Sequence, residues 1–125
     1  MNYMIWVLKD LGSHNKTHLI KQWIRKESKA KITLLHANHA YPTPFKDINL
    51  GELKHMEHWV SIHKDIDYGL SDHTEGILTP PIAVSMGAKV IEKHITFDKF
   101  AKGPDHKASM HPEEFTEMVN NIKSP

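Results

Sequence analysis

Short apolar runs alternate along most of the chain with segments whose apolar residues recur at helical spacing. Runs at 32–35, 65–70 and 89–95 are typical of buried strands. Apolar residues three or four positions apart predict helices over about 49–60, 76–86 and 112–122. Strands that alternate with helices in this way predict an α/β fold with parallel strands joined by right-handed crossovers. The pattern alone leaves open whether the strands form an open sheet or part of a barrel.

The first thirty residues carry a weaker pattern. Tyr3–Leu8 is apolar enough to be a strand or the remnant of one, and Ser13 or Asn15 is suited to cap a helix that runs to about residue 27. Four apolar residues share one face of that helix at helical spacing: Leu19, Ile20, Trp23 and Ile24. The other face is basic, which suits a nucleic-acid patch or a solvated helix face. Solvation is favoured, because no aromatic residues are interleaved with the charges.

Length and composition limit the classes of protein to which this chain can belong. A chain of 125 residues is the size of one domain, which we divide into residues 1–30 and 31–125. Its 16 basic and 15 acidic residues give a net charge of +1, which argues against nucleic acid or an acidic membrane as the main partner. There is no cysteine for a disulfide or a thiolate site. No apolar run is long enough for a membrane span, and Met1–Leu8 makes a poor signal peptide, so we expect a cytoplasmic protein.

Two polar triplets, each ending in histidine, follow two of the predicted strands. They are Ser71-Asp72-His73 and Glu92-Lys93-His94. The carboxyl ends of parallel strands meet at one edge of a sheet, about 4.8 Å apart, so two imidazoles there can share one metal ion at about 2.0–2.2 Å. The alternative is two unrelated surface histidines, in a chain that has eleven. For His55 and His58, on the predicted second helix, solvated surface positions are favoured.

A proline-rich loop follows the first predicted strand. Pro42 and Pro44 fix an extended conformation directly after Tyr41. Such a loop either holds the tyrosine beside a ligand or lets it pack on the core. Spacing alone favours packing on the core.

Four motifs together resemble the N-acetylneuraminate (sialic acid) synthase family. They are Tyr-Pro-Thr-Pro at 41–44, Ser-Asp-His-Thr at 71–74, Gly-Ala-Lys-Val-Ile-Glu-Lys-His at 87–94 and Gly-Pro-Asp-His-Lys-Ala-Ser at 103–109. The resemblance covers about residues 31–122 and implies a partial TIM-type (β/α) barrel of about three to four parallel strands with flanking helices. It implies only the last three strands of the barrel, with neither its first half nor the small antifreeze-like domain, so the chain reads as a fragment.

The resemblance also implies a reaction and a metal site. The family condenses phosphoenolpyruvate with the open-chain aldehyde of N-acetylmannosamine and releases phosphate by C–O cleavage. His73 and His94 match the two ligands of a divalent ion, typically Mn²⁺, with Mg²⁺ or Co²⁺ as alternatives. Such an ion polarises the aldehyde oxygen.

Further roles follow from the same motifs. Ser71 matches a phosphate-binding position, and His39 stands where the family usually has asparagine or serine to help hold phosphate. Tyr41 and Asp105 match positions that contact the sugar hydroxyls, and Glu92 is the candidate catalytic residue that orients water or sugar.

Three alternatives remain for the activity. The chain is a sialic acid synthase present in part, a legionaminic or pseudaminic acid synthase, or a truncated non-catalytic relative or split subunit. The missing lysines and glutamates of the first barrel half make catalysis by this chain alone unexpected. We therefore expect either self-association as a homo-oligomer or a partner that supplies the other half of the barrel.

Overall fold

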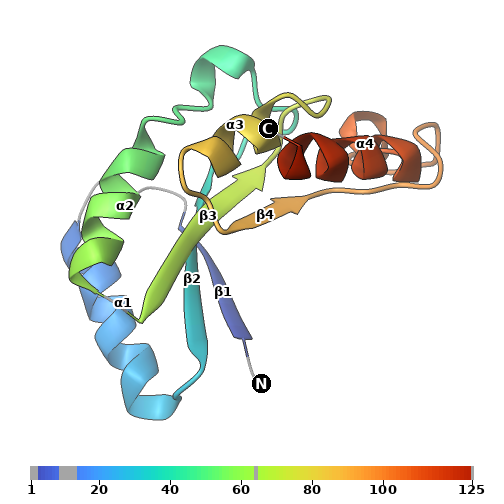
Figure 1. Ribbon diagram of the computed structural model, residues 1–125. Coiled ribbons are helices and arrows are strands. Elements are labelled where there is room, and N and C mark those ends of the chain that lie inside the picture. The colour runs from blue at the N-terminus through green and yellow to red at the C-terminus, as the bar shows by residue number, and fades with distance from the viewer. Residues whose placement is uncertain (1–2, 9–13, 64, 125) are drawn as a thin grey trace.

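A four-stranded parallel sheet forms the centre of the described chain (Figure 1). The computed structural model describes residues 3–8, 14–63 and 65–124, with side chains from residue 18 onward. The strands lie in the order of the sequence: β1 (Tyr3–Leu8), β2 (Lys31–Ala37), β3 (Ile66–Asp72) and β4 (Val90–Lys93). The predicted α/β class with three to four parallel strands is confirmed, and Tyr3–Leu8 is a strand paired with β2.

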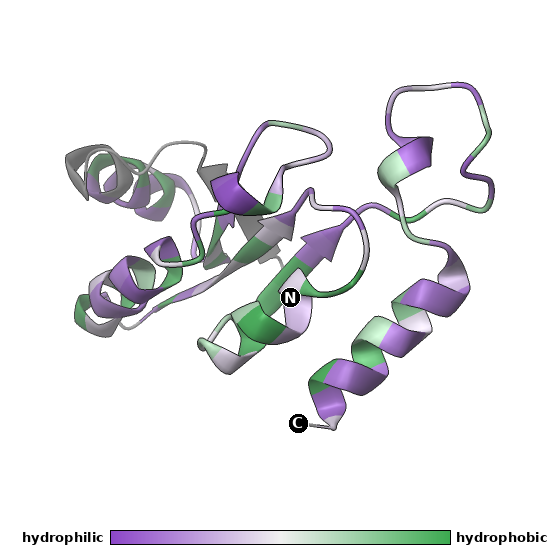
Figure 2. Cartoon of the chain, turned by 90° about the horizontal axis from the view of Figure 1, so that it is seen from above, coloured by the Kyte–Doolittle hydropathy of each residue, from purple (hydrophilic) through white to green (hydrophobic). Residues whose placement is uncertain are grey.

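The helices follow one another in an arc around one side of the sheet (Figures 1 and 2). They are α1 (His14–Glu27), α2 (Glu52–Ile62), α3 (Thr79–Ser85) and α4 (Pro112–Lys123). Single 3₁₀ turns at Phe45–Asp47 and His106–Ala108 interrupt the two long loops. Among the described helices, none combines the length and the apolar character needed to cross a membrane.

Alternate strand residues build the apolar core between the sheet and the helices. Ile66, Tyr68 and Leu70 of β3 are buried with Leu53 and Met56 of α2. Since successive side chains of a strand point to opposite faces, the residues between them face away from the helices. Ser71 therefore lies on the face of the sheet that points away from the helices, which we call the inner face. Glu92, its partner in the parallel register, lies on the same face.

Helix α1 departs from the predicted pattern. Ile24 is buried and Ile20 packs on the core, but Leu19 and Trp23 are 61% and 65% exposed. The prediction of one apolar face is therefore wrong for Leu19 and Trp23, because only the Ile20–Ile24 edge of the helix reaches the sheet. The expected cap at Ser13 lies outside the described residues, as does the side chain of Asn15.

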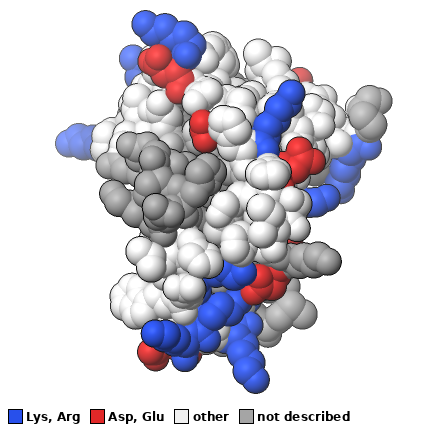
Figure 3. Space-filling model, turned by 90° about the vertical axis from the view of Figure 1, so that its left-hand side faces the viewer, with Lys and Arg blue, Asp and Glu red and all other residues white. Residues whose placement is uncertain are grey.

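The basic face of α1 is partly neutralised by Asp65, which precedes β3. Lys21 Nζ and Arg25 Nε lie 3.0 and 2.8 Å from the two carboxylate oxygens of Asp65. The Lys21 hydrogen bond is the largest cause that lowers the pKa of Asp65. Figure 3 shows basic and acidic side chains next to one another at the lower end of this face, where α1 ends. This pairing favours a solvated helix face over a nucleic-acid patch.

Two glycines allow close contacts of β3 with its neighbours. A Cβ on Gly69 would lie 2.1 Å from the carbonyl oxygen of Val90. Gly87, which ends α3, has φ +95°, and a Cβ there would lie 2.1 Å from Tyr68 Oη. Helix α3 thus ends at a glycine in the left-handed conformation, and it begins later than predicted, with prolines in its first turn.

Candidate active site

Three rings from different segments meet beyond the carboxyl ends of β3 and β4. The ring centroid of Tyr41 lies 5.4 Å from that of His73 and 4.6 Å from that of His94. The two histidine rings are 5.6 Å apart and nearly perpendicular, at 89°. The prediction that the two triplets bring their histidines together is in accord with this arrangement. Tyr41 lies outside the apolar core, so the expectation drawn from spacing alone is wrong.

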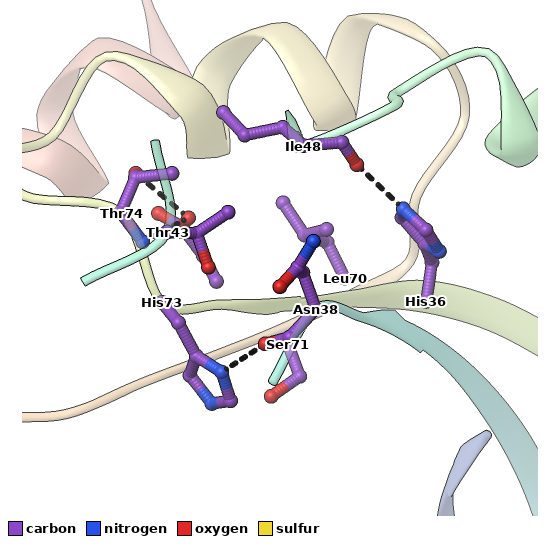
Figure 4. A pocket seen from close by; sticks show the side chains of 9 residues that line it. His36, Asn38, Thr43, Ile48, Leu70, Ser71, His73 and Thr74 are labelled. Atoms are coloured by element: carbon purple, nitrogen blue, oxygen red, sulfur yellow. Dashed lines mark hydrogen bonds between the residues drawn. The ribbon is translucent and has the colours of Figure 1, made fainter. Parts of the chain in front are cut away.

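A backbone carbonyl selects the tautomer of the His73 ring. Nδ1 of His73 lies 2.6 Å from the carbonyl oxygen of Asn38, a contact drawn in Figure 4. Because a carbonyl oxygen only accepts hydrogen bonds, Nδ1 carries the hydrogen. In the neutral ring Nε2 then holds the lone pair, and a histidine that binds a metal typically donates its other N–H to such a partner.

His94 is held through its backbone and faces a carboxylate. The amide of Met110 donates to the carbonyl oxygen of His94 at 3.0 Å, which ties the long loop back to the strand end. Nδ1 of His94 lies 3.8 Å from Asp105 Oδ2. That distance is too long for a hydrogen bond. The two side chains form an ion pair only when the histidine is protonated. Asp105, expected to contact a sugar, is 53% exposed and so accessible to a ligand.

The donor set fits an ion that needs few protein ligands. Within the part of the chain that the structure describes, no three side chains of histidine, aspartate or glutamate form a group that could hold a metal. The rings of His73 and His94, the pair named by the resemblance, lie close together, and their role as metal ligands stays a prediction in which oxygens of water or substrate complete the shell. Imidazole nitrogen with oxygen is a donor set compatible with Mn²⁺.

Ser71 and Glu92 form a polar pair on the inner face of the sheet. The Ser71 hydroxyl donates to Glu92 Oε1 at 2.7 Å, and Ser71 is only 3% exposed. A serine hydroxyl has one proton to donate. A phosphate bound at Ser71, the role implied by the resemblance, would compete with Glu92 for that proton.

Tyr41 is positioned by the loop that carries it and by the loop after β4. The Tyr41–Pro42 peptide is cis, and the amide of Thr43 donates to the carbonyl oxygen of His73 at 2.8 Å. The Tyr41 hydroxyl lies 3.1 Å from Ser109 Oγ and 3.3 Å from the carbonyl oxygen of Asp105. Burial, the largest cause, raises the pKa of Tyr41, so its hydroxyl stays neutral and able to donate near pH 7.

His39 makes no side-chain hydrogen bond or ring contact with the other candidates among the described residues. It is exposed in the loop directly after β2. His55 and His58 are exposed on α2, as favoured from the sequence. Sequence reasoning assigned no role to Asn38 or Ser109, although each stands within or beside a quoted motif. That adjacency was the available signal.

The comparisons with known proteins decide the family. The model of the NeuB family matches residues 11–124. The chain belongs to the NeuB family. It is 46% identical over 92 residues to the N,N'-diacetyllegionaminic acid synthase of Legionella pneumophila, covering 74% of this chain and 25% of that protein. It is 38% identical over 100 residues to the human N-acetylneuraminate-9-phosphate synthase, covering 80% and 27%. Pseudaminic acid synthases are also among its relatives.

A solved structure shows the same fold. The N-acetylneuraminic acid synthetase of Leptospira borgpetersenii superposes with a TM-score of 0.82 at 29% identity, over 97% of this chain and 40% of that one. The resemblance seen in the four motifs, and the barrel type that it implied, are confirmed. The chain spans about a quarter of the length of the two curated synthases given above, at 25% and 27%.

Proposed function

We propose that this NeuB-family chain carries part of the active site of a nonulosonic acid synthase. The reaction joins C3 of phosphoenolpyruvate to the aldehyde carbon of N-acetylmannosamine or a related acylamino sugar, adds water at C2 and releases phosphate by C–O cleavage. The observation that supports this most is the convergence of His73, His94 and Tyr41 at the carboxyl ends of two neighbouring strands, where (β/α) barrels keep their sites.

Each side chain of the group has a role that its contacts support. His73 and His94 would hold a divalent cation, for which we propose Mn²⁺, and this ion would polarise the aldehyde oxygen. The ring of Tyr41 lies beside both histidines, and its neutral hydroxyl is suited to orient a sugar hydroxyl. Asp105 lies exposed next to His94 and can accept hydrogen bonds from sugar hydroxyls.

Glu92 and Ser71 are suited to the phosphate side of the reaction. The Ser71 hydroxyl donates to Glu92 here, and it can turn to a phosphate oxygen when one is bound. The Glu92 carboxylate, relieved of that donor, would then accept a proton from the water that adds to C2. His39, exposed at the end of β2, is available to donate to the same phosphate.

The remainder of the catalytic machinery must come from other residues. We propose that this chain works with polypeptide that supplies the rest of a NeuB-type barrel, including the cations that bind phosphoenolpyruvate. The alternative is a non-catalytic relative that retains the site residues without using them.

Reconstitution tests this function. The chain is mixed with a polypeptide that carries the other strands of a NeuB-type barrel, and phosphate release from phosphoenolpyruvate is measured with N-acetylmannosamine and Mn²⁺. We expect sugar-dependent release that His94→Ala abolishes. His58→Ala, which removes an exposed histidine of α2, is the matched control and should leave the rate unchanged. Release that His94→Ala leaves intact would refute the role of His94, and no release with any sugar would support the non-catalytic alternative.

A legionaminic acid synthase is the second candidate. The identity to the Legionella pneumophila synthase, 46%, exceeds the 38% found with the human enzyme. The same assay with a sugar that bears two acetamido groups separates the two, because each synthase should prefer its own acceptor.

A further inference from the structure

A second cross-strand pair stands one residue beyond Ser71–Glu92 and points to the opposite face. The parallel register places Asp72 opposite Lys93. Lys93 Nζ lies 2.8 Å from Asp72 Oδ2, and the two side chains are 3% and 1% exposed. Because side chains alternate along a strand, this ion pair lies on the helix side of the sheet, behind the histidines.

Hydrogen bonds satisfy both buried charges and include the turn after β3. Asp72 Oδ1 accepts from the amide and the hydroxyl of Thr74 at 3.0 and 2.8 Å. Lys93 Nζ also donates to the carbonyl oxygen of Thr74 at 2.6 Å. Thr74 is itself 1% exposed. A buried ion pair is tolerated when its remaining donors and acceptors are occupied in this way.

The network fixes the backbone on both sides of one histidine and directly before the other. His73 lies between Asp72 and Thr74, which are both held, and His94 follows Lys93. The side chains of the two histidines leave the backbone on the face opposite to the network. Their ring separation of 5.6 Å therefore depends on how firmly β3 and β4 are held in register behind them.

We propose that Asp72 and Lys93 are positioning residues that set the separation of the His73 and His94 rings, and with it the affinity for a divalent cation. This inference rests on the proposed metal site. The pair does not touch substrate or ion, and acts through the register of two strands. An apolar pair of the same size would pack the two strands without a directed contact to Thr74.

Two readouts test the inference on the whole chain. The first is the dissociation constant for Mn²⁺, measured by titration calorimetry. The second needs no metal: the nuclear Overhauser cross-peak between the ring protons of His73 and His94. We expect Lys93→Met to weaken Mn²⁺ binding at least tenfold and to remove the cross-peak, because it leaves the Asp72 carboxylate unpaired.

The same substitution on an exposed pair is the control. Lys31 Nζ lies 2.7 Å from Asp67 Oδ2, with side chains 51% and 34% exposed, between β2 and β3. Lys31→Met should change the Mn²⁺ dissociation constant by less than twofold and should keep the cross-peak. An equal effect of Lys31→Met and Lys93→Met would overturn the inference.

A neutral double variant separates positioning from folding. The double variant Asp72→Asn/Lys93→Met contains no unpaired buried charge. It is used for the test if Lys93→Met alone does not fold. We expect circular dichroism of a folded chain with Mn²⁺ binding still at least fivefold weaker. Unchanged binding and an unchanged cross-peak in this variant would show that the pair serves stability alone. If the unaltered chain binds no Mn²⁺, the metal proposal fails, and the cross-peak alone decides the positioning role.

Discussion

Replacement of Gly87 by alanine should destabilise the fold through two effects that the structure separates. Gly87 ends α3 with φ +95°, in the left-handed region that an L side chain rarely adopts. The added Cβ would lie 2.1 Å from the Tyr68 hydroxyl oxygen, so the ring of Tyr68 must move. That hydroxyl donates to the carbonyl oxygen of Met86 at 2.9 Å, and the movement breaks this hydrogen bond.

The expected loss follows from adding these contributions. The left-handed backbone costs an alanine about 1–2 kcal/mol. Loss of the Tyr68–Met86 hydrogen bond adds about 1 kcal/mol. A displaced buried ring adds about 1 kcal/mol of rotamer strain. The total of about 3–4 kcal/mol is a large share of the stability typical of one domain.

Gly76 provides a matched control for the backbone effect. Its φ is +76°, and a Cβ there meets nothing within 4 Å. Gly76→Ala should therefore cost only about 1–2 kcal/mol. Urea unfolding followed by circular dichroism measures both losses.

A double-mutant cycle isolates the hydroxyl contact. In the Tyr68→Phe background the clashing atom is gone, and the cost of Gly87→Ala should approach that of Gly76→Ala. Equal losses for the two single alanine variants, or a loss from Gly87→Ala that Tyr68→Phe does not reduce, would refute the reasoning.

Two further predictions concern the core and pH. Leu53 is 0% exposed, so Leu53→Ala should cost about 2–5 kcal/mol in urea unfolding. Ile62→Ala, at a side chain 65% exposed, should cost far less, and a similar loss would contradict the described core. The pKa of Glu114 is lowered below 4.5, and the hydrogen bond from Lys99 is the largest cause. The contribution of the Glu114 carboxylate to the free energy of unfolding is therefore complete above about pH 4.5 and is lost as the pH falls further. Glu114→Gln should flatten the acid side of the profile of stability against pH.

The order of strands and helices could be predicted because buried strands and amphipathic helices leave different periods in the sequence. Element ends were harder. Helix α3 begins at Thr79, since Pro80 and Pro81 fit only its first turn, whereas the apolar pattern extends back to 76. Exposure of Trp23 could not be predicted, because it depends on the angle at which α1 lies on the sheet.

The meeting of the two histidines could be predicted from strand ends alone, but their surroundings could not. The contact of Asn38 with His73 depends on the path of a loop. Alternation along a strand was a usable signal for the Asp72–Lys93 pair. If Ser71 and His73 face inward, Asp72 must face the helices. Reading the two triplets by alternation predicts that pair without any structure.

The alternation of Glu92 and Lys93 also determines where insertions and deletions of residues are tolerated. One codon inserted or deleted within β4 would shift the frame of inward and outward positions by one. The carboxylate of Glu92 would then turn toward apolar helices, and the ammonium of Lys93 toward the ligand side. Changes of length in the loop at 97–105 leave both residues in place. Insertions and deletions in descendants of this gene should therefore fall in the loops and spare the strand.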